Sequence, residues 1–363
     1  MKIINIAGAR PNFMKIAPLI QAMEAHGDIE PVLVHTGQHY DSVMSKVFFD
    51  ELGIPEPQVN LEVGPGERLS QIERIMQRFE PVFLKENPDV VLVVGDVNST
   101  IACARVASKH GCLVAHVEAG LRSFDTDMPE EINRVETDQL SDLLFVTEPS
   151  GMQNLEREGV KGEAHFVGNV MIDSLISHLE KARVLNTPGH HGLTRGGYFV
   201  GTFHRPSNVD AKPNLKGILD IIEHICRQTR MVLPLHPRTR NSLEQHSLLD
   251  RLQKIDGLTL TEPLGYLEFL SLVDGAKAVV TDSGGIQEET TYLQVPCITM
   301  RDNTERPITV DAGSNVLAGT DQRAVMHAID EVFAGRCKIG SNPELWDGHA
   351  AQRIVASLYE RVT

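Results

Sequence analysis

Short runs of apolar, β-branched residues alternate with longer amphipathic segments along the whole chain, and this alternation limits the fold more than any other feature. In the first half, strands are expected at 3–7, 90–94, 113–117 and 143–147, and helices at 13–25 and 100–110. The strand runs are almost continuously apolar, as in a parallel sheet whose two faces are both covered by helices. The first half is therefore predicted to be a doubly wound α/β domain.

The second half repeats this pattern. Strands are expected at 198–203, 231–235, 258–261, 279–281 and 296–300, and helices at 215–226, 286–293 and 324–333. At roughly 100–200 residues per domain, a chain of 363 residues has room for two such units. We therefore predict an α/β protein with two Rossmann-like domains, residues 1–169 and 170–349, and a C-terminal helix at 350–363 that packs back on the first.

Composition and charge restrict the kind of partner. A net charge of -15 repels nucleic acid and anionic membranes, so neither is expected as a partner. The apolar run after Met1 is too short for a signal peptide, and no stretch approaches the roughly 18 apolar residues of a membrane span. The five cysteines are scattered and form no C-x-x-C pair, which is typical of free thiols in a reducing compartment. We expect a cytoplasmic protein without a bound metal.

Parallel α/β sheets bind ligands at the carboxyl ends of their strands, so the polar residues after each strand are candidates for function. Arg10 follows the first strand and offers a planar pair of donors for phosphate or carboxylate, although it could equally fix a loop. Asp96 follows the strand 90–94, where a helix-capping role is an alternative. Glu118 ends an apolar strand, where a charge is costly without a partner. Acid–base chemistry or an ion pair with Arg122 would explain it.

Two further acids, Glu130 and Glu131, open a predicted helix after Pro129. Acidic residues in the first turn complement the helix dipole, and this alone explains both. Their closeness in sequence to Glu118 makes one of them a catalytic candidate, with Glu130 preferred and Glu131 as the alternative.

In the second half, histidine and arginine follow two strands in the same way. His204 and Arg205 follow the strand at 198–203, and His236 and Arg238 follow the next one. Imidazole titrates near neutral pH and guanidinium is a permanent cation. A lone histidine is more often structural, but two such strand ends favour an edge that binds an anion.

The strongest local signal is Thr-Asp-Ser-Gly-Gly at 281–285, where a buried strand ends and a helix begins. Backbone N–H groups without obstructing side chains, at the positive end of a helix, form an anion site. Glu289 lies one turn later, where a carboxylate can accept two ribose hydroxyls. No Lys-Ser/Thr pair follows the glycines, so this is not a Walker loop. The run predicts a nucleotide diphosphate site.

Together these motifs resemble the non-hydrolysing UDP-N-acetylglucosamine 2-epimerases from end to end. Each motif alone is weak, but the ordered set is specific. The set comprises Gly-x-Arg-Pro at 8–11, Lys15 with Ala17 and Pro18, Gly95-Asp96, His-Val-Glu-Ala-Gly-Leu-Arg at 116–122, Pro-Glu-Glu with Asn-Arg at 129–134, His204-Arg205 with Asn208, Asp-Ser-Gly-Gly-Ile-Gln-Glu-Glu at 282–289, and Arg301-Asp302 with Thr-Glu-Arg-Pro at 304–307.

The resemblance implies two domains arranged as in the GT-B glycosyltransferases, with the active site in the cleft between them. It implies reversible inversion at C2 of UDP-GlcNAc to give UDP-ManNAc. UDP is eliminated in the anti sense to leave a 2-acetamidoglucal and is then added back. It also implies a homodimer, and no cofactor.

Residue roles carry over by motif. The resemblance implies that the catalytic residues are Asp96, Glu118, Glu130 and His204. It implies that substrate and UDP are bound by Arg10, Lys15, His236, Ser283, Gly284, Gly285, Glu289 and Arg306. The C2 proton is weakly acidic and needs a positioned carboxylate base. The leaving UDP needs electrostatic stabilisation from Arg10, His204 and the glycine turn.

The sequence departs from the family pattern at several positions. Ala9 and Asn12 replace a threonine and an acid, and Ser207 replaces a glutamate. Some members bind a second UDP-GlcNAc as an activator through a Gln-His segment, which corresponds here to residues 36–40 and departs at Gly37 and Tyr40. The allosteric candidates that remain are Gln38, Arg68 and Arg205, with a contribution from His236.

Four alternatives stay open. A hydrolysing relative would release ManNAc and UDP, and a related 2-epimerase would accept another UDP-acylamino sugar. A glycosyltransferase of similar fold would need an acceptor. A sensor of nucleotide sugars would not turn over, which the three acids make less attractive.

Overall fold

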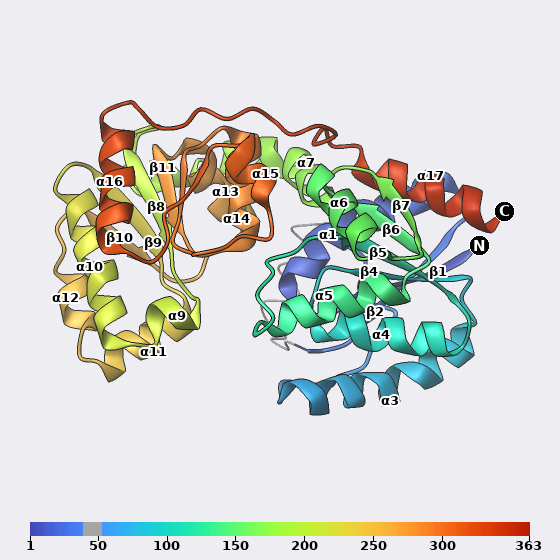
Figure 1. Cartoon of the computed structure of the whole chain (residues 1–363). Helices are drawn as coiled ribbons and strands as arrows, with labels where there is room; N and C mark the ends of the chain where they lie inside the picture. The colour runs from blue at the N-terminus through green and yellow to red at the C-terminus, as the bar shows by residue number, and fades with distance from the viewer. Residues whose placement is uncertain (39–52) are drawn as a thin grey trace. The chain divides into compact units, whose positions relative to one another are not determined.

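The structure, a computed structural model, describes residues 1–38 and 53–363. They form two compact units: Met1–Ser177 with Glu344–Thr363, and His178–Pro343. In each unit, helices cover both faces of a sheet whose described strands are all paired in parallel (Figure 1). The expected fold class, two Rossmann-like α/β domains, is confirmed.

The described part of the first unit contains a seven-stranded sheet in the order β3-β2-β1-β4-β5-β6-β7. The strands are β1 (Lys2–Ala7), β2 (Glu30–His35), β3 (Val59–Asn60), β4 (Val90–Val94), β5 (Leu113–Ala119), β6 (Leu143–Val146) and β7 (Glu163–Phe166). The helices are α1 (Arg10–His26), α3 (Arg68–Glu86), α4 (Asn98–Lys109), α5 (Pro129–Leu140), α6 (Pro149–Arg157), α7 (Val170–Leu185), which continues into the second unit, and α17 (Ala350–Val362).

The strand order reverses between β1 and β4, because β2 and β3 lie on one side of this pair and β5 to β7 on the other. Every residue of β4 is buried, which explains its unbroken Val-Val-Leu-Val-Val sequence. In a doubly wound sheet, ligands bind beyond the carboxyl ends of the strands at such a reversal. The loops that follow β1 and β4 are therefore the place to look for function.

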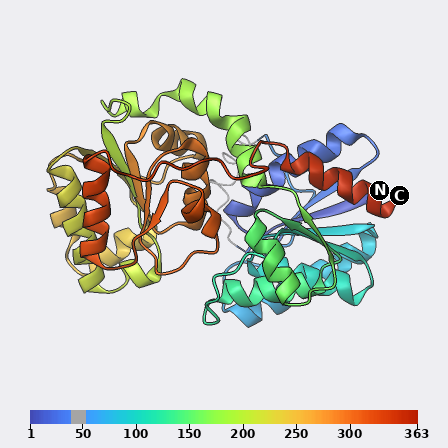
Figure 2. The ribbon, with the colours of Figure 1, turned by 45° about the horizontal axis from the view of Figure 1, so that its top comes forward.

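Helix α17 packs on α1, so the two ends of the chain lie close together (Figure 2). Pro18 has no N–H and leaves the Met14 carbonyl of α1 without its helical donor. The Ser174 hydroxyl of α7 donates to that carbonyl instead. Asp173 of α7 accepts the N–H groups of Ala350 and Ala351 at 3.2 and 2.7 Å. These bonds join α1, α7 and α17 into one layer.

The second unit contains a six-stranded sheet in the order β10-β9-β8-β11-β12-β13. The strands are β8 (Tyr198–Thr202), β9 (Arg230–Pro234), β10 (Leu258–Thr261), β11 (Ala278–Thr281), β12 (Cys297–Thr299) and β13 (Asn315–Leu317). The helices are α8 (Thr187–His190), α9 (Pro206–Val209), α10 (Lys212–Cys226), α11 (Pro237–Gln245), α12 (Leu249–Gln253), α13 (Tyr266–Gly275), α14 (Gly284–Leu293), α15 (Pro307–Asp311) and α16 (Gln322–Phe333).

Both faces of this second sheet are buried, since Phe199 of β8 joins one apolar cluster and Tyr198 and Val200 join another. The strand order reverses between β8 and β11. The segments 203–208 and 282–285, which the sequence singled out, follow these two strands directly. None of the helices in residues 1–38 and 53–363 is both long and apolar enough to cross a membrane.

Candidate active site

Glu118 lies at the carboxyl edge of the first sheet in an unusual backbone conformation. Its φ is +70°, and the pairing of β5 with β6 shifts register between Val117 and Ala119. A non-glycine residue held in the left-handed region costs about 1–3 kcal/mol, and such residues gather at functional sites. The side chain is buried, and its Oε2 lies 2.5 Å from Nζ of Lys15 on α1. This bulge gives a buried carboxylate a cationic partner at the sheet edge.

Gly95 brings the end of β4 close to that carboxylate. Its φ is +69°, and a Cβ placed on it would lie 3.4 Å from Nζ of Lys15 and 3.5 Å from Oε2 of Glu118. A side chain here would be strained by the positive φ, and its Cβ would be in van der Waals contact with both groups. The next residue, Asp96, is thus positioned beside Glu118 by a turn that requires glycine.

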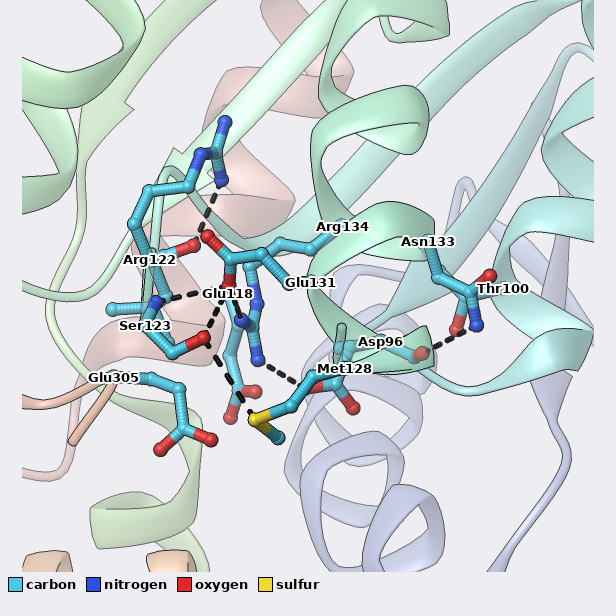
Figure 3. A network of polar contacts seen from close by, with 12 residues as sticks. Asp96, Thr100, Glu118, Arg122, Ser123, Met128, Glu131, Asn133, Arg134 and Glu305 are labelled. Atoms are coloured by element: carbon cyan, nitrogen blue, oxygen red, sulfur yellow. Dashed lines mark hydrogen bonds and ion pairs between the residues drawn. The ribbon is translucent and has the colours of Figure 1, made fainter. Parts of the chain in front are cut away.

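Asp96 is held by two residues of α5 (Figure 3). The buried guanidinium of Arg134 pairs with the Asp96 carboxylate and, at 2.7 Å, with Glu131. The amide of Asn133 donates to the Asp96 carbonyl at 2.9 Å. Because the Asp96 side chain keeps 29% of its surface exposed, it is fixed in place yet accessible to a ligand.

The two neighbouring acids of α5 have different surroundings. Glu131 is buried and accepts the N–H and the hydroxyl of Ser123, both at 2.9 Å (Figure 3). It also accepts the N–H of Phe124 at 3.1 Å. These bonds, together with the ion pair to Arg134, give Glu131 a structural role: it fixes the loop before α5. Glu130 is exposed at the second position of the helix, where its carboxylate is accessible.

The proposed ion pair between Glu118 and Arg122 does not form. Arg122 pairs instead with Asp138 at 2.7 Å and Glu158 at 2.6 Å, because its side chain extends to the back of α5 and α6. Asp138 also bonds the Nδ1 of His116 at 2.7 Å. The other ring nitrogen of His116 bonds the Gly95 carbonyl at 2.9 Å, so this buried chain of contacts supports the turn before Asp96.

Burial raises the pKa of Asp138, but the hydrogen bond from His116 and the charge of Arg122 outweigh it and hold the pKa below its usual value. Asp138 therefore stays ionised. The sequence contains a signal for this buried charged group. Glu131, Arg134 and Asp138 are spaced by three and four residues, which places three charges on one buried face of α5.

The loop after β1 is braced by Asn12, one of the residues that depart from the family pattern. Its Oδ1 accepts the N–H of Gly8 at 3.2 Å and of Ala9 at 2.9 Å, and its amide donates to the Val94 carbonyl at 3.1 Å. Asn12 thus ties the ends of β1 and β4 together. The side chain of Arg10 lies outside the part of the chain that the structure describes.

Two allosteric candidates of the first unit, Gln38 and Arg68, form hydrogen bonds within the protein. Gln38 is buried, and its Oε1 accepts the N–H and hydroxyl of Ser99 at 3.1 and 2.8 Å. Arg68 donates to Oδ1 of Asn133 at 2.6 Å, and so is connected through Asn133 to the Asp96 carbonyl. His39 and Tyr40 lie outside the described residues.

In the second unit, α14 begins at Gly284 directly after the turn at Asp282 and Ser283. No side chain caps its first turn, so the N–H groups there retain the capacity to bind an anion. A Cβ on Gly285 would meet no atom within 4 Å, which leaves open space beside this helix end. A Cβ on Gly284 would lie 3.1 Å from Arg306 Nη1 and 3.7 Å from Arg301 Nη1. Two guanidinium groups therefore flank the helix end.

Acidic partners hold these two arginines. Glu305 bonds Arg301 at 2.9 and 3.1 Å, and Glu288 lies 2.8 Å from Nε of Arg306. The sequence pointed to Arg306 but assigned no role to Arg301, whose place beside Gly284 depends on the fold of the loop after β12. The arrangement can bind a diphosphate through backbone N–H groups and two cations.

Glu289 lies one helical turn after Gly285 and therefore on the same side of α14. Burial, followed by the nearby charge of Glu288, raises the pKa of Glu289 to about 8, although a hydrogen bond with Tyr266 opposes the shift. At neutral pH this carboxyl group is therefore largely protonated in the absence of a ligand, and it can donate a hydrogen bond as well as accept one.

The raised pKa of Glu289 predicts a stability effect. Between pH 4.5 and about 8 the folded chain binds a proton that the unfolded chain has released, so stability falls as pH rises through this window. We expect the melting temperature of Glu289→Gln, measured by calorimetry, to fall less between pH 5 and pH 8 than that of the wild type. Glu244→Gln on the exposed side of α11 is the control and should follow the wild type. If the melting temperatures of Glu289→Gln and the wild type change equally with pH, the raised pKa of Glu289 is contradicted.

His204 and His236 meet at the same edge of the second sheet, with ring centroids 5.5 Å apart. The Nδ1 of His236 accepts the N–H of Arg238 at 3.1 Å. Arg205 donates from Nε to the Asp282 carbonyl at 3.1 Å. The fold therefore gathers His204, Arg205 and His236 around the start of α14, although the pair at 204 and 205, His236 and Gly284 are far apart in sequence. Nowhere in residues 1–38 and 53–363 do three His, Cys, Asp or Glu side chains gather that could hold a metal.

Comparison with known proteins agrees with this geometry. A family model described as UDP-N-acetylglucosamine 2-epimerase matches residues 21–359. The UDP-N-acetylglucosamine 2-epimerase of Methanocaldococcus jannaschii is 43% identical over 364 residues, which cover 99% of each chain. The UDP-2,3-diacetamido-2,3-dideoxy-D-glucuronate 2-epimerase of Pseudomonas aeruginosa is 41% identical over 332 residues, 90% of this chain and 91% of that one.

A solved structure extends the comparison to the fold. The UDP-GlcNAc 2-epimerase of Methanocaldococcus jannaschii, in complex with UDP-GlcNAc and UDP, matches with a TM-score of 0.90 at 42% identity and covers 99% of this chain and 100% of that one. The match over both α/β units agrees with the glycosyltransferase-like fold that the sequence implied. The resemblance drawn from the motifs is confirmed, and the chain belongs to the UDP-N-acetylglucosamine 2-epimerase family.

Proposed function

We propose that the chain interconverts UDP-GlcNAc and UDP-ManNAc by the non-hydrolysing route. The observation that carries the proposal is the pair of acids at the carboxyl edge of β4 and β5, with Glu118 held in a strained conformation against Lys15 and Asp96 held by Arg134. Family membership and the anion site at the start of α14 support a nucleotide diphosphate as part of the substrate.

The reaction needs two acid–base groups. A base removes the proton from C2, and the electron pair left on carbon forms the C1–C2 double bond as the C1–O bond to UDP breaks. UDP then adds back to C1 while a proton is delivered to the other face of C2. Asp96 and Glu118 supply two positioned carboxyl groups for these proton transfers, and the exposed Glu130 is the third candidate.

The departing UDP gains negative charge and must remain bound. We assign this task to the N–H groups of Gly284 and Gly285 and the hydroxyl of Ser283, whose own N–H donates to the Thr281 hydroxyl at 2.9 Å, together with Arg306 and His204. Glu289 is assigned to the ribose hydroxyls. Arg10, Lys15 and His236 complete the proposed set, with Lys15 acting on Glu118, which it contacts. A site that keeps UDP bound favours its return over attack by water.

A second substrate has specific support. The Pseudomonas aeruginosa relative, at 41% identity, is named for a 2-epimerase of UDP-2,3-diacetamido-2,3-dideoxy-D-glucuronate. That sugar carries an acetamido group at C2 as well, so the same C2 chemistry applies. Comparing kcat/KM for the two UDP-sugars would identify the preferred one.

Incubation with UDP-GlcNAc in deuterated water, followed by proton NMR, tests the reaction. We expect UDP-ManNAc to form without an added acceptor and deuterium to enter C2 of both UDP-sugars, because protonation follows elimination. Accumulation of free ManNAc with an equal amount of UDP would contradict the non-hydrolysing route. Turnover only after addition of a sugar acceptor would indicate a glycosyltransferase.

A further inference from the structure

A single buried carboxylate, Asp282, joins the two strands at which the order of the second sheet reverses. It follows β11, is fully buried, and receives hydrogen bonds from the segment that follows β8. The N–H of Arg205 donates to its Oδ2 at 2.9 Å and the amide of Asn208 at 3.1 Å. The N–H of His204 reaches both oxygens, at 3.1 and 3.0 Å.

The remaining partner is the imidazole of His204, whose Nδ1 lies 2.9 Å from Oδ1. Burial raises the pKa of Asp282, but the hydrogen bond and charge of His204 and the donors of the loop outweigh this effect. The pKa is therefore below its usual value, and the group remains a carboxylate. A carboxylate has no proton to give, so Nδ1 of His204 must be the donor. Nε2 is then the nitrogen left for a ligand, on a side chain that is 39% exposed.

We propose that Asp282 is a positioning residue, which holds His204 with its Nδ1–H toward the carboxylate so that Nε2 serves the diphosphate of the substrate. This inference rests on the proposed function, in which the start of α14 binds UDP. A phosphoryl oxygen only accepts, so a ring that keeps its Nδ1–H on the carboxylate must bind that oxygen through an Nε2–H, in a charge-assisted hydrogen bond. As the C1–O bond breaks, its electron pair moves to the oxygen that leaves with UDP. Negative charge builds up on the diphosphate, and the hydrogen bond strengthens without transfer of the proton.

The neighbouring His236 supports this assignment. Its Nδ1 accepts the N–H of Arg238, so a neutral His236 carries its proton on Nε2. Burial, and next the charge of His204, lower the pKa of His236, which favours that neutral form. In both imidazoles Nδ1 is bound inside the protein, as a donor in His204 and as an acceptor in His236, and Nε2 is the nitrogen left for a ligand.

Asp282→Asn separates the effect on His204 from the anchoring of the loop. If the amide oxygen takes the place of Oδ2, it still accepts the N–H of Arg205 and the amide of Asn208. The amide nitrogen then faces Nδ1 of His204 and donates to it, which requires Nδ1 to be unprotonated. The reverse orientation would place the amide N–H groups against the loop donors and is disfavoured. The substitution thus changes the protonation of one ring and preserves the loop.

Affinity for UDP, measured by calorimetry on the full chain, is the first readout, because UDP carries the charge that develops on the leaving group. We expect Asp282→Asn and His204→Ala each to weaken binding about 10- to 100-fold, the effect of one hydrogen bond to a charged group. The double variant should bind no more weakly than His204→Ala, since Asp282 acts through His204. Asp274→Asn is the matched control: it also changes a buried aspartate, paired with Arg183 and Arg195, and should bind UDP within about twofold of wild type.

Nitrogen NMR of the histidine rings is the second readout and needs no ligand. Nδ1 of His204, assigned by its loss in His204→Ala, should be protonated in the wild type and unprotonated in Asp282→Asn. Unchanged UDP affinity in Asp282→Asn, or an equal loss in the His204→Ala background, would overturn the proposal. A wild-type chain that binds no UDP would instead contradict the proposed function, and the nitrogen shifts would still decide the role of Asp282.

Discussion

Glu118→Gln should lower kcat for 2-epimerisation about 1000-fold or more, while the affinity for UDP stays within about threefold of wild type. A glutamine cannot take up or deliver the C2 proton, and positioned acid–base groups contribute about 10²- to 10⁴-fold to rates. The isosteric side chain can remain in the bulge of β5, so the fold is kept. UDP affinity is expected to persist because most of the proposed nucleotide contacts belong to the second unit, and the substitution leaves Arg10 in place. Steady-state assays and calorimetry on the same preparation measure both quantities.

The control for this variant is Glu136→Gln. Glu136 lies on α5 and forms a half-exposed ion pair with Arg105 at 2.6 Å, without contact to Lys15 or Asp96. Its loss should leave kcat unchanged, because partly exposed ion pairs contribute little. Asp96→Asn should behave like Glu118→Gln. Turnover of Glu118→Gln within tenfold of wild type would exclude it as an acid–base residue.

Gly285→Val should abolish detectable UDP binding and turnover while leaving the melting temperature within about 2 °C of wild type. The protein itself leaves open space at this position, since a Cβ on Gly285 meets no atom within 4 Å. A diphosphate bound to the first N–H groups of α14 would have to occupy that space. Loss of two hydrogen bonds to charged oxygens, at about 1.5–3 kcal/mol each, weakens binding at least about 100-fold.

Gly217→Val on α10 is the matched control for the second variant. Gly217 is a half-buried helical glycine whose nearest neighbour to a new Cβ is Gln322 Oε1, at 3.8 Å. It should bind UDP as tightly as the wild type. If Gly285→Val binds UDP normally, the diphosphate does not use the start of α14, and the proposed nucleotide site is wrong.

Sequence patterns were sufficient for the parts of the fold that depend on local chemistry. The apolar strand β4 and the Asp-Ser-Gly-Gly turn after β11 appear where the sequence indicated them, because buried parallel strands and glycine turns have short-range signatures. Strand β2 was not foreseen, since Pro31 interrupts its apolar run; it lies at the start of the strand, opposite Ile3. The reversal of strand order at β1 and β4 likewise has no local signature.

The candidate site could be predicted only to the level of residue types at strand ends. The pairing of Arg134 with Asp96 joins residues 38 positions apart and depends on the rotation of α5 against the sheet. The positive φ of Glu118 arises from a register shift between two strands. The distinction between Glu130 and Glu131 depends on a loop that folds back to donate three hydrogen bonds to one of them. Each of these requires the tertiary structure.

The packing of α17 on α1 has a consequence for synthesis in the cell. A ribosome makes residues 178–343 before it makes α17, although α17 belongs to the first unit. Until then Asp173 lacks the two N–H groups it binds, and the apolar surface that receives Ile354, Val355 and Leu358 is uncovered. Domains usually fold as the chain emerges, N-terminal first. Here the first unit, which carries Asp96 and Glu118, is completed last, after the second unit has been translated.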